Sequence, residues 1–314
     1  MGGGSWSTDY YQEQETVRRN SGKAAFAYNA AISTKPVSEQ TVHANLNPKG
    51  VRIRESRDSE EHPESNAIMV FFDVTGSMLA IPQILREKLP NLMDTLNKGS
   101  YIPDPQVFFG AVGDSRCDRG SLQVGQFESD NRVNEAFENM WLEGGGGGNM
   151  TESYQNAMFF ASRCTTLDCF EKRQKKGYLF LIGDEMYYPQ VSKREIDILI
   201  GDGFLQADLP TTELVAELKE KFHVYMIIPT EGSSHGRDPR IHNAWKDLLG
   251  ERVLFTDDIE SICEIIAMAV GLNEGVSLDK AREDLQNHGS SAAAINRAAS
   301  SLSGRTPDVR TIRL

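Results

Sequence analysis

A run of six apolar residues that ends abruptly in a polar turn constrains the fold of this chain more than any other feature. The run covers residues 67–72 and is followed by Asp73-Val-Thr75-Gly-Ser77. A short apolar run that ends in turn residues is typical of a strand buried on both faces, as in a parallel sheet. In open α/β sheets, ligands bind at the carboxyl ends of such strands. We therefore expect the turn at 73–77 to lie at a binding edge.

The turn carries three oxygen-bearing side chains at alternate positions. Asp73, Thr75 and Ser77 place one carboxylate and two hydroxyls on the same side of it. Hard oxygen ligands of this kind suit a small divalent cation. The pattern therefore predicts a metal site.

Helical and strand patterns alternate along the rest of the chain. Apolar spacing predicts helices over 79–96, 211–221, 238–249 and 258–270, and strands over 107–112, 122–127, 178–182, 223–229 and 252–256. Such alternation predicts the α/β class, with a doubly wound, mostly parallel sheet flanked by helices. The segment 186–209 interrupts the pattern on the same edge as the metal turn. It either shapes a partner surface or is a plain surface excursion.

The spacing Asp-x-Thr-x-Ser resembles the metal-ion-dependent adhesion site (MIDAS) of von Willebrand factor A (VWA) domains. Two further stretches fall where that family has its second and third metal loops. They are the glycine-rich segment 144–153 and Gly183-Asp184, which follows the predicted strand 178–182. The resemblance covers about residues 67–271 and implies a Rossmann-like VWA fold.

The second loop has two alternative ligands. Counting back five residues from Ala157 puts Glu152 at the metal position, which resembles the Glu-containing variant of β-integrin-like domains. Thr151 remains an alternative, because a loop of five glycines accommodates a shift of one residue. The resemblance implies Mg²⁺, with Mn²⁺ or Ca²⁺ as alternatives, and Asp184 acting through a water or through the two hydroxyls. The implied metal residues are Asp73, Thr75, Ser77, Glu152 or Thr151, and Asp184.

The implied function is binding, with no catalytic residue. In the family, an Asp or Glu of a partner protein completes the coordination of the ion, and intracellular members serve as adaptors or assembly factors, often beside an AAA+ ATPase. A structural subunit of a larger particle, held together by its terminal arms, is the alternative hypothesis. A metal-dependent phosphotransferase or phosphatase is less favoured. Haloacid dehalogenase-like enzymes need acids where this chain has Thr75 and Tyr188.

Composition and charge restrict the partners. The formal net charge of −12 argues against nucleic acid and against anionic membrane surfaces. No apolar stretch is long enough for a transmembrane helix and residues 1–6 lack a signal-peptide core. The expected location is therefore cytoplasmic, and export or packaging without a standard signal is the alternative.

Three regions differ in composition. Residues 1–66 form a polar N-terminal arm, 67–272 the VWA-like domain, and 273–314 a C-terminal helical and basic tail. Neither arm is apolar enough to build its own core, so composition favours disorder in isolation. Wrapping of the domain and ordering on a partner are the alternatives.

Overall fold

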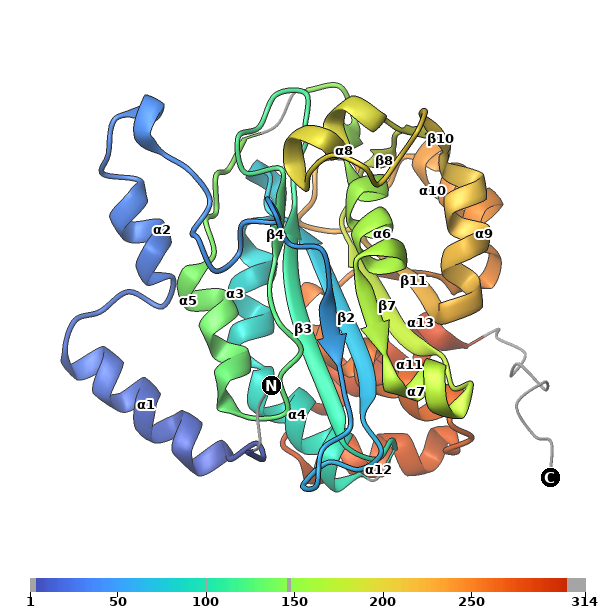
Figure 1. Cartoon of the computed structure of the whole chain (residues 1–314). Coiled ribbons are helices and arrows are strands. Elements are labelled where there is room, and N and C mark those ends of the chain that lie inside the picture. Colours follow the sequence, from blue (N-terminus) through green and yellow to red (C-terminus); the bar gives the residue numbers. More distant parts are fainter. Residues whose placement is uncertain (1–3, 100, 146–147, 304–314) are drawn as a thin grey trace.

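The computed structural model describes residues 4–99, 101–145 and 148–303. A six-stranded sheet lies at the centre, with helices on both faces (Figure 1). Its strand order is β12-β11-β7-β2-β3-β4, and every neighbouring pair is parallel except β3 and β4. This confirms the predicted α/β class and the doubly wound, mostly parallel sheet.

The central sheet consists of β2 (Asn66–Asp73), β3 (Pro105–Val112), β4 (Leu122–Val124), β7 (Gly177–Ile182), β11 (Phe222–Pro229) and β12 (Val253–Thr256). Short strand pairs outside it are formed by β1 (Arg54–Ser56), β5 (Thr151–Glu152), β6 (Thr165–Leu167), β8 (Met186–Tyr187), β9 (Gln190–Val191) and β10 (Leu209–Pro210). The α-helices are α1 (Thr8–Asn20), α2 (Ala27–Ile32), α3 (Ala80–Glu87), α4 (Leu89–Lys98), α5 (Glu135–Asn139), α6 (Tyr154–Arg163), α7 (Asp168–Arg173), α8 (Lys193–Leu199), α9 (Thr211–Lys221), α10 (Pro239–Leu249), α11 (Ile262–Asn273), α12 (Leu278–Asn287) and α13 (Ala292–Leu302). Short 3-10 turns are Val37–Glu39, Gly76–Met78, Asn131–Asn134, Gly250–Arg252 and Ile259–Ser261.

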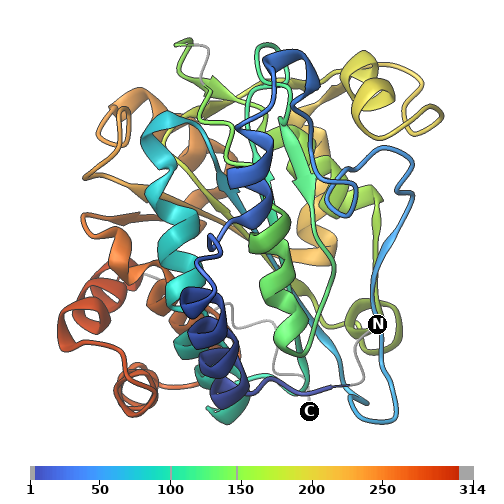
Figure 2. The same cartoon turned by 90° about the vertical axis from the view of Figure 1, so that its left-hand side faces the viewer.

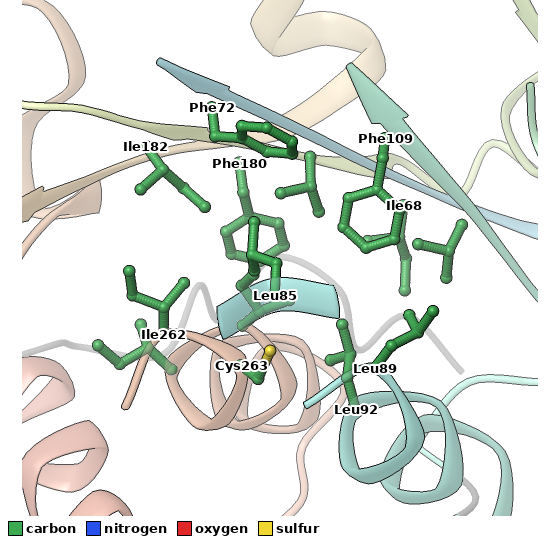
Figure 3. Packing of buried hydrophobic residues seen from close by; sticks show 14 of the residues in the cluster. Ile68, Phe72, Leu85, Leu89, Leu92, Phe109, Phe180, Ile182, Ile262 and Cys263 are labelled. Atoms are coloured by element: carbon green, nitrogen blue, oxygen red, sulfur yellow. The ribbon is translucent and has the colours of Figure 1, made fainter. Parts of the chain in front are cut away.

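The strand β2 is buried on both faces because successive side chains point to opposite sides of a strand. Ile68 and Phe72 pack on the face covered by α3, α4 and α11, as Figure 3 shows. Met69 and Phe71 pack on the opposite face against α6, α9 and α10. With helices on both sides, the polar turn after β2 is exposed only at the carboxyl edge of the sheet.

The predicted helix over 79–96 is broken into α3 and α4 at Lys88. Pro90 has no N–H to donate to the carbonyl of Arg86, four residues earlier, so the helical ladder is interrupted there. The hydroxyl of Tyr11 donates to that carbonyl instead, at 2.7 Å. The break therefore provides an attachment point for the N-terminal arm.

Both arms pack on the domain over the residues that are described, which differs from the disorder that their polar composition favours. The N-terminal arm lies along one side of the sheet (Figure 2) and adds Tyr11, Phe26 and Leu46 to the core. Its β1 pairs with β6, and the carbonyl of Leu46 accepts from Val124 N in the edge strand β4 at 2.8 Å. At the other end, α12 and α13 pack against α11. The tail after residue 303 lies outside the described residues.

Across the described parts of the chain, we find no helix with the length and apolar character needed to cross a membrane.

Candidate metal centre

Asp73 ends β2 and is fully buried at the carboxyl edge of the sheet. Its Oδ1 accepts from the backbone N–H of Thr75 at 2.6 Å, which closes the turn. Its Oδ2 accepts from the hydroxyl of Tyr154 at 3.4 Å. The strand fixes the Asp73 backbone, and these two donors orient its carboxylate.

The glycine-rich segment packs directly against this turn. The carbonyl of Gly145 accepts from Gly76 N at 3.0 Å, and the N–H of Gly144 donates to the Val74 carbonyl at 3.3 Å. Gly144 has φ of 69°, a conformation that favours glycine. Gly146 and Gly147 of the predicted loop lie outside the described residues. In the turn itself, Thr75 is buried and Ser77 is half-buried.

Glu152 and Thr151, the two candidate ligands of the second loop, differ in the direction of their side chains. They form β5, which pairs in parallel with β8, so their side chains face opposite ways. Glu152 is fully buried, and neither of its carboxylate oxygens has a hydrogen-bond partner among the described residues. Thr151 is half-buried and its hydroxyl donates to the carbonyl of Asn149 at 3.3 Å. The structure therefore leaves Glu152 with free ligand oxygens, whereas the Thr151 hydroxyl has a local partner.

Asp184 follows β7, the neighbour of β2 in the sheet, and is also fully buried. Its Oδ2 accepts from the backbone N–H of His235 at 2.9 Å, whereas Oδ1 has no partner among the described residues. The next residue, Glu185, has its Oε1 3.8 Å from Nε2 of His235. Asp73 and Asp184 thus meet where parallel strands end side by side.

The electrostatics of this edge are those of crowded, desolvated carboxylates. Burial, followed by the negative charge of Asp73, raises the pKa of Glu152 far above its usual range. Burial also raises the pKa of Asp73, and Asp184 adds to the rise. The pKa of Glu185 is raised to about 7 by burial and by the charges of Asp73 and Asp184. Burial is the main cause of each of these shifts and the neighbouring carboxylates add to it, so a positive charge at this edge would counter them.

A divalent cation would supply that charge, and the donor set fits one. Buried charges are normally paired or bound to metals, and the free oxygens of Glu152 and Asp184 have neither partner. Among the described residues, no three His, Cys, Asp or Glu side chains are grouped as a metal-binding set. The carboxylates therefore cannot complete a site by themselves. The hydroxyls of Thr75 and Ser77, with water, would have to provide the remaining ligands.

The sequence interpretation missed Asp114, which follows β3 as Asp184 follows β7. Its Oδ2 accepts from the Tyr188 hydroxyl at 2.9 Å and from Asn149 Nδ2 at 3.0 Å. Oδ2 thus holds the glycine-rich segment and the insertion after β7, whereas Oδ1 accepts from the backbone N–H of Arg116 at 3.0 Å. The signal was present, because an apolar strand followed by Gly113-Asp114 repeats the pattern of Gly183-Asp184.

A second missed residue is Tyr154, which opens α6 beneath the site. Burial raises the pKa of Tyr154 well above its ordinary value, so its hydroxyl remains a proton donor to Asp73. Gly183 makes room for it, since a Cβ at that position would lie 1.9 Å from the Tyr154 hydroxyl. No short motif marks such a contact, because it joins residues from separate elements.

No family model and no curated protein matches this sequence. Several solved structures are similar. Proximal thread matrix protein 1 from the mussel byssus has 13% identity and a TM-score of 0.41 over 67% of this chain and 48% of its own. The pilus adhesin SpaC from Lactobacillus rhamnosus GG has 11% identity and a TM-score of 0.44 over 75% of this chain and 31% of its own. BatB from Bacteroides thetaiotaomicron has 14% identity and a TM-score of 0.41 over 67% of this chain and 98% of its own.

The chain thus spans less than half the length of the byssus protein and of the adhesin. One form of the byssus protein is described with zinc in its MIDAS motif. At these identities and TM-scores, we draw no argument about this chain from the likeness.

Proposed function

We propose that this protein is a non-catalytic interaction module of the VWA type that binds one divalent cation at the carboxyl edge of its sheet. Asp73, Ser77 and Glu152 would contact the ion directly, with Thr75 beside them. Asp184 would act through a water or through the hydroxyls of the turn. Mg²⁺ is the expected ion, because it is usually held by few protein ligands and keeps exchangeable waters. Mn²⁺ and Ca²⁺ are alternatives.

One observation carries this proposal, namely the burial of Glu152 beside Asp73 with both carboxylate oxygens unpartnered. A buried carboxylate without a partner is costly, and a cation removes that cost. We choose Glu152 over Thr151 because the Thr151 hydroxyl already donates to the carbonyl of Asn149, whereas the Glu152 oxygens have no partner among the described residues.

An Asp or Glu of a partner protein would occupy the open position of the ion. Asp73 and Glu152 together balance the two charges of the ion, so its attraction for a third carboxylate is modest. A role as adaptor or assembly factor fits such reversible binding. An AAA+ ATPase or another subunit of a multiprotein assembly is the expected class of partner. A structural subunit of a larger particle, held together by its arms, is the alternative hypothesis.

The site lacks the acids that a phosphotransferase of similar turn sequence would need. Thr75 stands at one of these positions, and the Tyr188 hydroxyl, at the other, donates to Asp114. We expect no turnover of phosphate esters or nucleotides that depends on Asp73. The measurement compares wild-type protein and Asp73→Ala, each purified to constant specific activity. Turnover that persists in the wild type and disappears in Asp73→Ala would promote the enzyme hypothesis.

Affinity capture tests the binding role. Immobilised wild-type protein is exposed to native extract in Mg²⁺ and in EDTA, with Asp73→Ala as the matched control. The expected result is a protein retained by the wild type in Mg²⁺ only. Retention that is indifferent both to EDTA and to the substitution would contradict metal-bridged binding.

A further inference from the structure

A second polar site lies away from the metal edge, between the N-terminal arm and the edge of the sheet. It is a pocket of about 600 Å³. One wall comes from the arm, over residues 44–54, and the other from residues 125–139. This volume lies within the range of roughly 300–1,000 Å³ that is usual for small-molecule sites.

Arg54 is the unusual member of the lining. Its backbone is fixed, because it belongs to β1 and its N–H donates to the Cys164 carbonyl at 2.8 Å. Its Nε is buried without a hydrogen-bond partner, and Nη2 reaches only the Asn45 carbonyl, at 3.4 Å. Burial lowers the pKa of Arg54. Within the described ranges, no carboxylate forms an ion pair with this guanidinium.

The other cations of the pocket are already engaged. Arg132 pairs with Asp130 at 3.0 Å and with Glu128 at 3.3 Å. Lys49 Nζ donates to the carbonyls of Asp197 and Ile198, at the end of α8. The charged side chains of the lining are cationic at Lys49, Arg54 and Arg132, and acidic at Glu128 and Glu135. The pocket is therefore net positive in a chain whose net charge is −12.

We propose that this pocket binds a small oxyanion, a carboxylate or phosphate group carried by a small molecule, with the guanidinium of Arg54 as its ion-pair partner. Leaving a half-buried guanidinium unpaired is costly, and an oxyanion matches the planar fork of its N–H donors. Because the walls come from the arm and from the domain, the ligand would also fasten the arm to the sheet. This site is independent of the metal centre and of its proposed function.

The test measures thermal unfolding and binding without divalent cations, at constant ionic strength, with inorganic phosphate or succinate replacing chloride. Wild-type protein should show a saturable rise of Tm, since a ligand of the folded state stabilises it. Arg54→Met should bind at least about tenfold more weakly, as expected when a charge-assisted pair is lost. In chloride alone it should be at least as stable as wild type, because an unpaired buried charge has been removed. Arg54→Lys, which keeps the charge without the fork, should bind with intermediate affinity.

Arg52→Met is the matched control. Arg52 lies two residues away, is exposed, and stacks over Phe204 with a distance of 5.6 Å to the ring centroid, outside the pocket. The Arg52→Met variant should respond to the anions as wild type does. In both wild type and Arg52→Met, hydrogen exchange over residues 44–54 should slow when the anion is added. A response to phosphate alone or to succinate alone would identify the group that is bound. An equal rise of Tm in Arg54→Met, or no rise in wild type with either anion, would overturn the proposal.

Discussion

Glu152 and Asp73 are far apart in the sequence, yet both are fully buried and the charge of Asp73 acts on Glu152. Burial and then the charge of Asp73 raise the pKa of Glu152, whereas burial and the charge of Asp184 raise the pKa of Asp73. At the scale of single residues, metal binding therefore depends on which side chain of the second loop contacts the ion.

Substituting Glu152 and Thr151 one at a time shows which of the two side chains binds the ion. Glu152→Ala should weaken Mg²⁺ or Mn²⁺ binding by more than the roughly 10–100-fold that is typical for loss of a supporting partner, because a charged ligand is removed. Thr151→Ala should change the affinity little, since the Thr151 hydroxyl faces Asn149. Calorimetric titration gives both values. The reverse order would mean that the loop binds the ion through Thr151.

Gly183 provides a test of the support beneath the site. Gly183→Ala should lower the free energy of unfolding by about 1–3 kcal/mol, as expected for overpacking, because the new Cβ meets the Tyr154 ring. Adding Tyr154→Phe removes the closest atom and should restore part of the loss. Denaturant unfolding measures both changes. If Gly183→Ala is as stable as wild type, the packing described here is wrong.

At the scale of elements, the N-terminal arm supports the loops of the site. Asn29 of α2 accepts from the backbone N–H of Leu142 at 2.9 Å, just before the glycine-rich segment. Arg119 donates to the Val37 carbonyl of the arm and, at 3.3 Å, to Glu143. The arm is itself anchored through α1, where Glu15 pairs with Arg86 of α3.

This anchor should depend on pH. Although burial acts to raise it, hydrogen bonds from Arg18 and Arg86 lower the pKa of Glu15 from 4.5 to about 2. A depressed carboxyl pKa stabilises the folded protein above pH 4.5, and the stabilisation is lost as the pH falls from 4.5 towards 2. Glu15→Gln should remove this pH dependence and cost about 3 kcal/mol, because Arg86 is left buried and unpaired.

Unfolding of both proteins between pH 6 and pH 2, followed by circular dichroism, checks this expectation. The double replacement Glu15→Met with Arg86→Met is the control and should recover much of the loss, since apolar side chains can replace a buried ion pair. Equal acid sensitivity of wild type and Glu15→Gln would show that the pair does not anchor α1.

Sequence patterns predicted the elements of the domain well where periodicity was strong. Residues 67–72 could be assigned to a buried strand because nothing polar interrupts them, and the helix predicted over 211–221 coincides with α9. The break at Lys88 was missed although Pro90 marks it locally, and what the sequence does not show is that Tyr11, from a distant segment, donates to the freed carbonyl. Contacts between separate segments have no local signature, which also explains why Tyr154 was missed in the site, whereas Asp114 has a local signal in Gly113-Asp114.

At the scale of the whole molecule, the topology brings the three loops to one edge. β2 lies between β3 and β7. From β2 the chain continues to β3 and β4 on one side, and it later returns to the other side of β2 for β7, β11 and β12. Such a switch point is where open α/β sheets bind ligands. The arms then pack on the domain (Figures 1 and 2). Composition alone could not predict this, because the few apolar residues of the arms are buried in the core of the domain and do not form a core of their own.

The central claim is that this edge holds a divalent cation, and calorimetric titration of Mg²⁺ and Mn²⁺ into metal-free protein tests it most directly. We predict saturable binding of a single ion per chain, a Tm that rises once the concentration exceeds Kd, and reversal by EDTA. Asp73→Ala, shown to be folded by circular dichroism, should lose this binding. Absence of binding to folded wild-type protein, or equal binding by Asp73→Ala, would contradict the account.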